Sequence, residues 1–362
     1  MAIIADCVCL QKRDLVYLQD DLSGQSLLKW RRLLKLKHDR TTRRIRLSKA
    51  GACIMKRVAL FLLVLLCPWG QAAEFPTRPL SMLIGFEQGG STDIQGKVLA
   101  EVMSEVIGQP VNIIYYPGAG GAVAAAMLAN NQDQGYVFQF GLSLPFTFAP
   151  LVSPASYQLD SFRYVAGVTL DQPAFVTGGV QDFKTWHEFL DYARQNPGLV
   201  YATQNLQDRF IMQYIAKKEG LSLRFIPTTG GAGMAPLIVS GAAQIAFSGG
   251  THGVYTETGE MVVLAGLPED RLFYYPDVPS LRELGYPFSM DVIRVISVPA
   301  NTPDEVVSTL YGALQQVVKD PRFIDVTENV IRMPVVLLDE VELKRVFDLQ
   351  VESYQRLIEL SK

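Results

Sequence analysis

Apolar stretches of strand length alternate with stretches of helical spacing along the chain from Glu74 onward. Leu80–Phe86 is a nearly unbroken apolar run that predicts a buried strand, and apolar residues then recur every three or four positions, as on one helix face. Val111–Tyr115 and the alanine-rich segment Ala122–Ala129 repeat this order. Regular alternation of strands and helices indicates an α/β fold.

The alternation falls into two sets, which predicts two lobes. Arg163–Leu170 and Ala174–Thr177 look like strands that leave the first set, and Gly178-Gly179 is a candidate hinge. A second strand-and-helix set follows, and a strand at Asp291–Val298 starts the return to the first. We therefore expect a first lobe made of residues 74–177 and 291–362, and a second lobe made of residues 178–290.

Two glycine-rich turns stand between a strand and a helix in the first lobe. They are Gly89-Gly90-Ser91-Thr92-Asp93 and Pro117-Gly118-Ala119-Gly120-Gly121. Such turns aim backbone N–H groups and the positive end of the helix dipole at one point, which suits an anion. The alternative is a pair of ordinary tight turns, for which glycine is the default residue. Ser143 ends the third strand, where ligands of open α/β sheets bind, and Thr228–Gly233 is a third glycine turn.

The first 73 residues differ from the rest. Residues 1–54 are rich in lysine and arginine. A basic start at Met55-Lys56-Arg57, an apolar run at Val58–Cys67 and small residues at 70–73 then follow, as in a secretory signal peptide. We interpret residues 55–73 as a signal peptide and residues 1–54 as an upstream translation artefact. A basic arm that binds nucleic acid or membrane is the alternative for residues 1–54.

Composition excludes several classes of protein. Apolar residues make up 49 % of the chain and charged residues 19 %, which is typical of a globular protein. The net charge is −3 although the first 57 residues are strongly basic, so the mature part is acidic and has no general attraction for nucleic acid. All four cysteines precede residue 74, so the mature part has no thiolate metal site.

Catalytic and cofactor motifs are incomplete in this chain. Gly90 stands where a P-loop has its lysine, and Val123 stands where a dinucleotide fingerprint has its third glycine. Pro145 breaks the nucleophile-elbow pattern around Ser143. Only His187 and His252 remain after export, too few for a metal set. The sequence therefore predicts binding without catalysis, and no cofactor or metal.

A series of short motifs resembles one known family. It includes Phe75–Leu80, both glycine turns, Gly108–Val111, Asp133–Tyr136, Asn196-Pro197-Gly198, Pro276–Ser280, Glu283–Tyr286 and Pro299–Pro303. In this order the motifs resemble the periplasmic solute-binding receptors of tripartite tricarboxylate transporters, the Bug-type or TctC-like proteins. The resemblance covers essentially all of Glu74–Lys362.

The resemblance implies a two-lobed flytrap like the type II periplasmic binding proteins, with each lobe a mixed sheet flanked by helices. It implies a monomer in the periplasm that holds a small carboxylate by backbone amides, hydroxyls and water, and delivers it to membrane permease subunits. A ligand-sensing subunit of a membrane signalling system is the alternative. By position, the candidate ligand-binding residues are Gly90, Ser91, Thr92, Asp93, Ala119, Gly120, Ser143, Thr229 and Gly230. Asp93 is expected to fix the turn rather than to contact an anion.

Departures from the family pattern bear on the ligand. Glu87-Gln88 replaces prolines, Tyr116 replaces a common arginine, and Gln244 replaces a common aspartate. Gln204–Arg209 replaces a small-residue loop, and Ile293-Arg294 stands where an aromatic often lines the cleft. We hypothesise that Arg209 or Arg294 supplies a charged contact, and that Glu87 reads the ammonium of a zwitterionic ligand. The alternative is that all three side chains face solvent.

Overall fold

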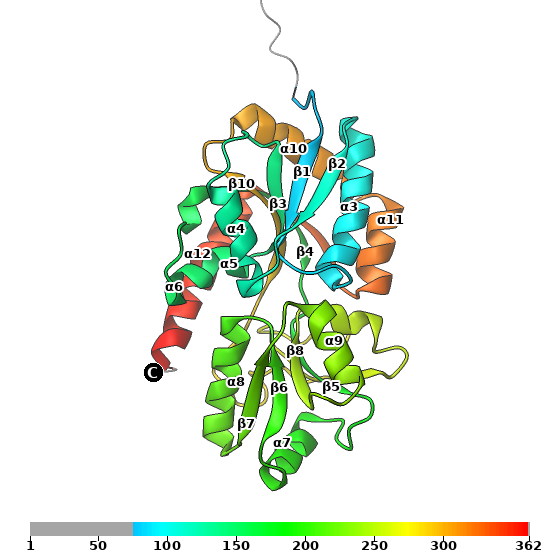
Figure 1. The fold of residues 1–362 in the computed structure, drawn as a ribbon, viewed down its shortest axis with the longest axis vertical. Coiled ribbons are helices and arrows are strands. Elements are labelled where there is room, and N and C mark those ends of the chain that lie inside the picture. The colour runs from blue at the N-terminus through cyan, green and yellow to red at the C-terminus, as the bar shows by residue number, and fades with distance from the viewer. Residues whose placement is uncertain (1–74, 361–362) are drawn as a thin grey trace, which may run out of the picture. The chain divides into compact units, whose positions relative to one another are not determined.

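The computed structural model describes residues 75–360 (Figure 1). The predicted upstream artefact at residues 1–54 and the predicted signal peptide at residues 55–73 lie outside the described residues. In the described part, the helices do not reach the length and apolar content needed to cross a membrane.

The first sheet has six strands in the order β11-β4-β10-β3-β1-β2. The bounds are β1 Leu80–Ile84, β2 Val111–Tyr115, β3 Val137–Leu142, β4 Phe162–Leu170, β10 Ile293–Pro299 and β11 Val335–Leu338. Strands β1, β2 and β3 are parallel, whereas β10 runs antiparallel between β3 and β4. The carboxyl ends of β1, β2 and β3 therefore meet at one edge of the sheet.

Helices cover both faces of this sheet (Figure 1). Helices α3, α10 and α11 form one layer, and α4, α5 and α12 form the other. The bounds are α3 Ser91–Ile107, α4 Ala122–Ala129, α5 Leu144–Thr147, α6 Ala149–Val152, α10 Asp304–Val317, α11 Pro321–Ile324 and α12 Glu340–Leu360. Short turns of helix are η1 Ala119–Gly121, η2 Leu159–Ser161 and η4 Asp325–Val330. Together they form the first lobe.

The second sheet has five strands in the order β7-β6-β8-β5-β9. The bounds are β5 Ala174–Gly178, β6 Leu199–Thr203, β7 Leu223–Pro227, β8 Ile245–Ser248 and β9 Met261–Gly266. Helices α7 (Trp186–Gln195) and α8 (Leu206–Glu219) pack on one face through buried aromatic and aliphatic side chains. Helix α9 (Gly231–Val239) packs on the other face against small residues, and η3 spans Thr251–Val254. This sheet and its helices form the second lobe.

The chain crosses between the lobes at residues 171–173 and again just before β10. The N–H of Asp171 donates to the carbonyl of Val292 (2.8 Å), so the two crossing segments lie side by side. The expected boundary between residues 177 and 178 instead falls inside β5, a strand of the second sheet.

The candidate hinge at Gly178 and Gly179 has a different role in the structure. A Cβ at Gly178 would meet the carbonyl of Ile238, and one at Gly179 would meet the carbonyl of Gly259. These glycines allow a close backbone approach within the second lobe, whereas the chain changes lobe at residues 171–173.

Most predicted elements match the structure, and β2 and α4 have the predicted bounds. Helix α8 begins at Leu206, where Asn205 and Asp208 form a capping box. The N-cap of α10 is Pro303, with no side-chain cap bond.

Candidate functional site

The first glycine turn connects β1 to α3 and is held from inside by Asp93. The carboxylate of Asp93, in the first turn of α3, accepts hydrogen bonds from the N–H of Gly89 (2.7 Å) and from Nζ of Lys97 (2.8 Å). Its other oxygen accepts a bond from the hydroxyl of Tyr115 at the end of β2 (2.6 Å). Asp93 is fully buried and holds the turn through these bonds, whereas the N-cap of α3 is Gly90, with no side-chain cap bond.

These bonds also set the charge of Asp93. Burial alone would raise the pKa of the Asp93 carboxyl, but the hydrogen bonds from Lys97, Tyr115 and Gly89 outweigh it and hold the pKa below its ordinary value. Burial and the neighbouring carboxylate raise the pKa of Tyr115 to about 12. Asp93 is therefore an anion whose acceptors are already used within the turn.

The second glycine turn lies against the first. Gly118, Gly120 and Gly121 all have positive φ, and Ala119 adopts φ +48° between them. A Cβ at Gly85, the residue after β1, would lie 2.6 Å from Cα of Gly121, so the backbone of the second turn touches the chain that leads from β1 into the first turn. The structure thus brings together the two turns that the sequence predicts as suited to an anion. We call the region between Gly89–Asp93 and Pro117–Gly121 the jaw.

The second lobe contributes the opposite side of this jaw. Gly230, the N-cap of α9, is buried against Phe86, and a Cβ there would lie 3.0 Å from its ring. A Cβ at Gly120 would lie 2.9 Å from Cβ of Asn205, the N-cap of α8. The N-termini of α8 and α9 therefore face the two turns, as the positive ends of helix dipoles around an anion would.

Other predicted residues lie at or beside this contact. Thr92 is buried in the first turn of α3, whereas Ala119 and Thr229 are exposed. Ser143 is fully buried at the end of β3, where its hydroxyl oxygen accepts from the N–H of Ile293 (3.3 Å) and its N–H donates to the carbonyl of Ile293 (2.8 Å). Ser143 therefore joins β3 to β10 beneath the turns.

Glu87, Arg209 and Arg294, the three charged residues proposed from the sequence to contact a ligand, lie in different places. Glu87 is exposed in the first turn. Arg209 is exposed on α8, with its guanidinium carbon 5.9 Å from the ring centre of Phe225. Arg294 is fully buried, so the alternative that all three face solvent is wrong for Arg294.

Sequence reasoning missed the partners of Arg294, which are Ser91, Gln95, Asp171 and Gly249. It also missed Asn205 and Thr251, which face the turns from the second lobe. One available signal was the arginine within the apolar run of β10, because a buried charge requires a partner elsewhere.

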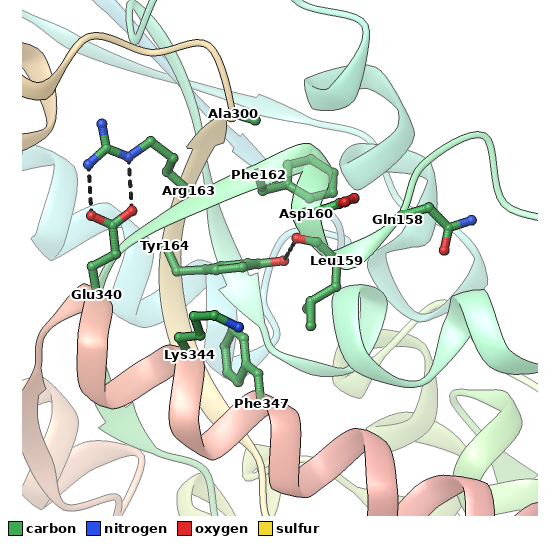
Figure 2. Close-up of a pocket in the computed structure, with 10 residues that line it drawn as sticks. All are labelled: Gln158, Leu159, Asp160, Phe162, Arg163, Tyr164, Ala300, Glu340, Lys344 and Phe347. Carbon is green, nitrogen blue, oxygen red and sulfur yellow. Dashed lines mark hydrogen bonds and ion pairs between the residues drawn. The ribbon is translucent and has the colours of Figure 1, made fainter.

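A cavity of about 620 Å³ lies elsewhere in the first lobe, between β4 and α12 (Figure 2). Arg163 makes a two-bond ion pair with Glu340 at one end, and the hydroxyl of Tyr164 donates to the carbonyl of Leu159. The cavity is lined by Gln158, Leu159, Asp160, Phe162, Arg163, Tyr164, Ala300, Glu340, Lys344 and Phe347. None of these is a predicted ligand-binding residue, so this cavity is separate from the jaw.

The polar groups of the jaw are hydrogen-bonding groups. Its groups are backbone amides, hydroxyls and helix N-termini, and His252 beside it is buried, which lowers its pKa to about 3. Among residues 75–360, the acidic, histidine and cysteine side chains form no group suited to a metal ion. The arrangement can hold an anion by hydrogen bonds without a metal.

Comparison with known proteins agrees with this geometry. The family model described as "Tripartite tricarboxylate transporter family receptor" matches residues 96–361. The matched residues include the second turn and Gly230 but begin just after the first turn. A UPF0065 protein from the gbd 5′ region of Cupriavidus necator is 28 % identical over 257 residues, covering 70 % of this chain and 78 % of the relative.

Solved structures share the fold. The periplasmic binding protein BugD superposes with a TM-score of 0.72 at 23 % identity, covering 79 % of this chain and 98 % of that one. MatC from Rhodopseudomonas palustris, solved with bound malate, superposes with a TM-score of 0.70 at 20 % identity, covering 78 % and 100 %. The two sheets flanked by helices and these neighbours confirm the expected two-lobed, type II fold.

Proposed function

The chain belongs to the family of tripartite tricarboxylate transporter receptors, whose members bind solutes and are not enzymes, and on that premise we propose what it binds and where it works. It is an exported periplasmic receptor that captures a small carboxylate between its lobes. It then delivers the carboxylate to the permease subunits of a tripartite transporter, and it acts as a monomer.

The observation that carries this proposal is the convergence of two glycine turns with two helix N-termini. The second turn touches the segment after β1, where Gly85 meets Gly121, while Asn205 and Gly230 cap helices that begin on the opposite side. Backbone N–H groups and helix dipoles attract a carboxylate without a charged side chain. The malate bound to MatC, a structural neighbour, is a ligand of this class.

The close approach of the two lobes supports capture of a ligand between them rather than binding on the surface of one lobe. The N–H of Ser91 in the first lobe lies 3.4 Å from the hydroxyl oxygen of Thr251 in the second lobe, a long hydrogen bond. A ligand that contacts both lobes binds the closed state more tightly, and so shifts the population toward it. A permease that recognises the closed state would then select loaded receptor.

Thermal unfolding tests the proposal. The chain starting at Glu74 is refolded to remove any copurified ligand and is then heated with mono-, di- and tricarboxylates. A ligand that binds only the folded state at a hundredfold excess over its dissociation constant stabilises it by about 2.7 kcal/mol. We expect a higher unfolding midpoint with at least one di- or tricarboxylate, and unchanged midpoints with every acid would refute carboxylate capture.

A further inference from the structure

Arg294 is a buried arginine whose guanidinium is bonded at every nitrogen. Nε and Nη2 both donate to Oδ1 of Asp171, at 3.0 and 2.8 Å. Nη1 donates to the carbonyl of Ser91 and to Oε1 of Gln95, both at 3.0 Å. Nη2 also donates to the hydroxyl oxygen of Ser91 at 2.7 Å. Because its N–H groups are committed to protein acceptors, Arg294 has no donor left for a ligand.

The acceptors of Arg294 come from both lobes. Ser91 and Gln95 lie in the first turns of α3, and Asp171 lies in the segment that crosses between the lobes. The carbonyl of Gly249, just after β8 in the second lobe, accepts from Nη2 at 3.2 Å. The hydroxyl of Ser91 donates to this same carbonyl at 3.3 Å. Arg294 and Ser91 thus hold one carbonyl of the second lobe together.

This contact depends on the lobes being together. Separation of the lobes would break the bonds to Gly249 and the bond from Ser91 to Thr251, while the bonds of Arg294 to Ser91, Gln95 and Asp171 connect segments on the first-lobe side. A hydrogen bond from an ionised donor is roughly twice as strong as a neutral one, and burial strengthens it further. The arginine therefore stabilises the closed arrangement specifically.

We propose that Arg294 is a positioning residue that holds the two lobes closed behind a bound ligand without contacting it. This inference rests on the proposed receptor function for its meaning, but the closure itself is a property of the ligand-free chain. The buried ion pair with Asp171 keeps the guanidinium aimed at Gly249. Its effect on binding is to slow release of the ligand after capture.

The main test combines closure and kinetics in Arg294→Lys. Dyes placed on exposed surfaces of the two lobes report the closed fraction by energy transfer in ligand-free protein. Stopped-flow measurements with malate, or with another acid that shifts the unfolding midpoint, give the two rate constants. We expect a smaller closed fraction and about a tenfold faster dissociation, because one charged hydrogen bond to the second lobe is lost. The association rate constant should stay within about twofold.

Two further variants keep the test decisive. Arg163→Lys is the matched control, because Arg163 pairs with Glu340 and Asp304 within the first lobe and should change neither closure nor release. Ser91→Ala removes the hydroxyl that bonds both Arg294 and Gly249, and serves if Arg294→Lys does not fold. Its closed fraction should fall in the same way.

Three results would overturn the inference. A larger loss of affinity for dicarboxylates than for monocarboxylates would mean that Arg294 contacts the ligand. A lower unfolding midpoint with an unchanged closed fraction and release rate would mean a merely structural role. An unchanged closed fraction in both Arg294→Lys and Ser91→Ala would mean that Arg294 does not hold the lobes closed. If wild-type chain binds no carboxylate, the proposed function fails, but the ligand-free closed fraction still decides the role of Arg294.

Discussion

The hydroxyl of Tyr115 donates a 2.6 Å hydrogen bond to Oδ1 of Asp93, which joins the end of β2 to the first turn of α3. The same carboxylate holds the N–H of Gly89 through its other oxygen. Tyr115 therefore supports the first glycine turn from the neighbouring strand.

Removal of that hydroxyl should loosen the turn. We expect Tyr115→Phe to lower the free energy of unfolding by about 2 kcal/mol, as for a lost hydrogen bond to a charged group, and to weaken carboxylate binding as well. Denaturant unfolding and titration calorimetry measure the two effects. Tyr116→Phe is the control, because it removes a hydroxyl one position later without touching Asp93. Equal behaviour of the two variants would contradict this role of Tyr115.

Gly120 provides a test of lobe closure. Alanine at Gly120 would place its Cβ 2.9 Å from Cβ of Asn205 in the second lobe, and φ there is +64°. Overpacking of this kind costs about 1–3 kcal/mol, so Gly120→Ala should weaken ligand binding about tenfold.

Gly108 supplies the matched control for this variant. It has a similar φ of +71° at the end of α3, but an added Cβ would have no neighbour within 4 Å. Gly108→Ala should therefore lose stability through backbone strain yet keep its affinity. An equal loss of affinity in both variants would mean that strain, and not the approach of Asn205, is responsible.

Much of the fold could be predicted because the pattern is local. The apolar run at Val111–Tyr115 and the alanines of Ala122–Ala129 define β2 and α4 to the residue. Strand β11 was not predicted, because Val335–Leu338 is short, half-buried at a sheet edge and lacks alternation. The predicted lobe boundary falls inside β5, after the chain has crossed at residues 171–173, because a glycine pair looks like a hinge, whereas Gly178 and Gly179 pack closely on carbonyls distant in sequence.

The site was predictable only as far as backbone conformation controls it. Glycine turns after strands predict the jaw, and Asp93 holds the first turn through the N–H of Gly89. The contacts of Arg294 join residues as much as 203 positions apart, and a local pattern does not indicate such pairs. Asn205 faces the site because β6 and α8 place it there, which depends on how the lobes meet.

Charge selectivity tests the hypothesis about Glu87 and Arg209. Glu87→Gln should weaken binding of an amino-dicarboxylate such as aspartate about twofold while leaving succinate unchanged, because Glu87 is exposed and its field is screened. Arg209→Gln should change neither affinity, since its guanidinium lies over the ring of Phe225. Competition titrations with the two acids measure the ratio of the affinities for aspartate and succinate. If Glu87→Gln leaves the ratio unchanged, Glu87 does not read a ligand ammonium.

His252 makes the stability of the second lobe depend on pH. Its side chain is 1 % exposed, with Nδ1 3.0 Å from the hydroxyl oxygen of Ser248 and the ring 5.2 Å from that of Tyr275. Burial lowers the pKa of His252 from 6.5 to about 3, so the folded chain keeps this imidazole neutral where the unfolded chain protonates it. The unfolded state binds the extra proton, so the contribution of His252 to stability falls as pH drops from about 6.5 toward 3.

The part of the pH dependence of stability that is due to His252 can be isolated by replacing this residue. Burial raises the pKa of Asp208 to about 6, which gives a slope of opposite sign over the same range, so the wild-type profile alone is ambiguous. Asp208 is present in both proteins. Its contribution therefore cancels when the free energy of unfolding of wild type is subtracted from that of His252→Gln at each pH. Between pH 7 and pH 5, we expect the free energy of unfolding of the variant to rise by about 2 kcal/mol relative to that of wild type, as measured by urea unfolding. His187→Gln, at an exposed position on α7, should show no such shift. A flat difference for His252→Gln would mean that the folded chain accepts the charged imidazole, and that the contact with Ser248 holds a cation rather than a neutral ring.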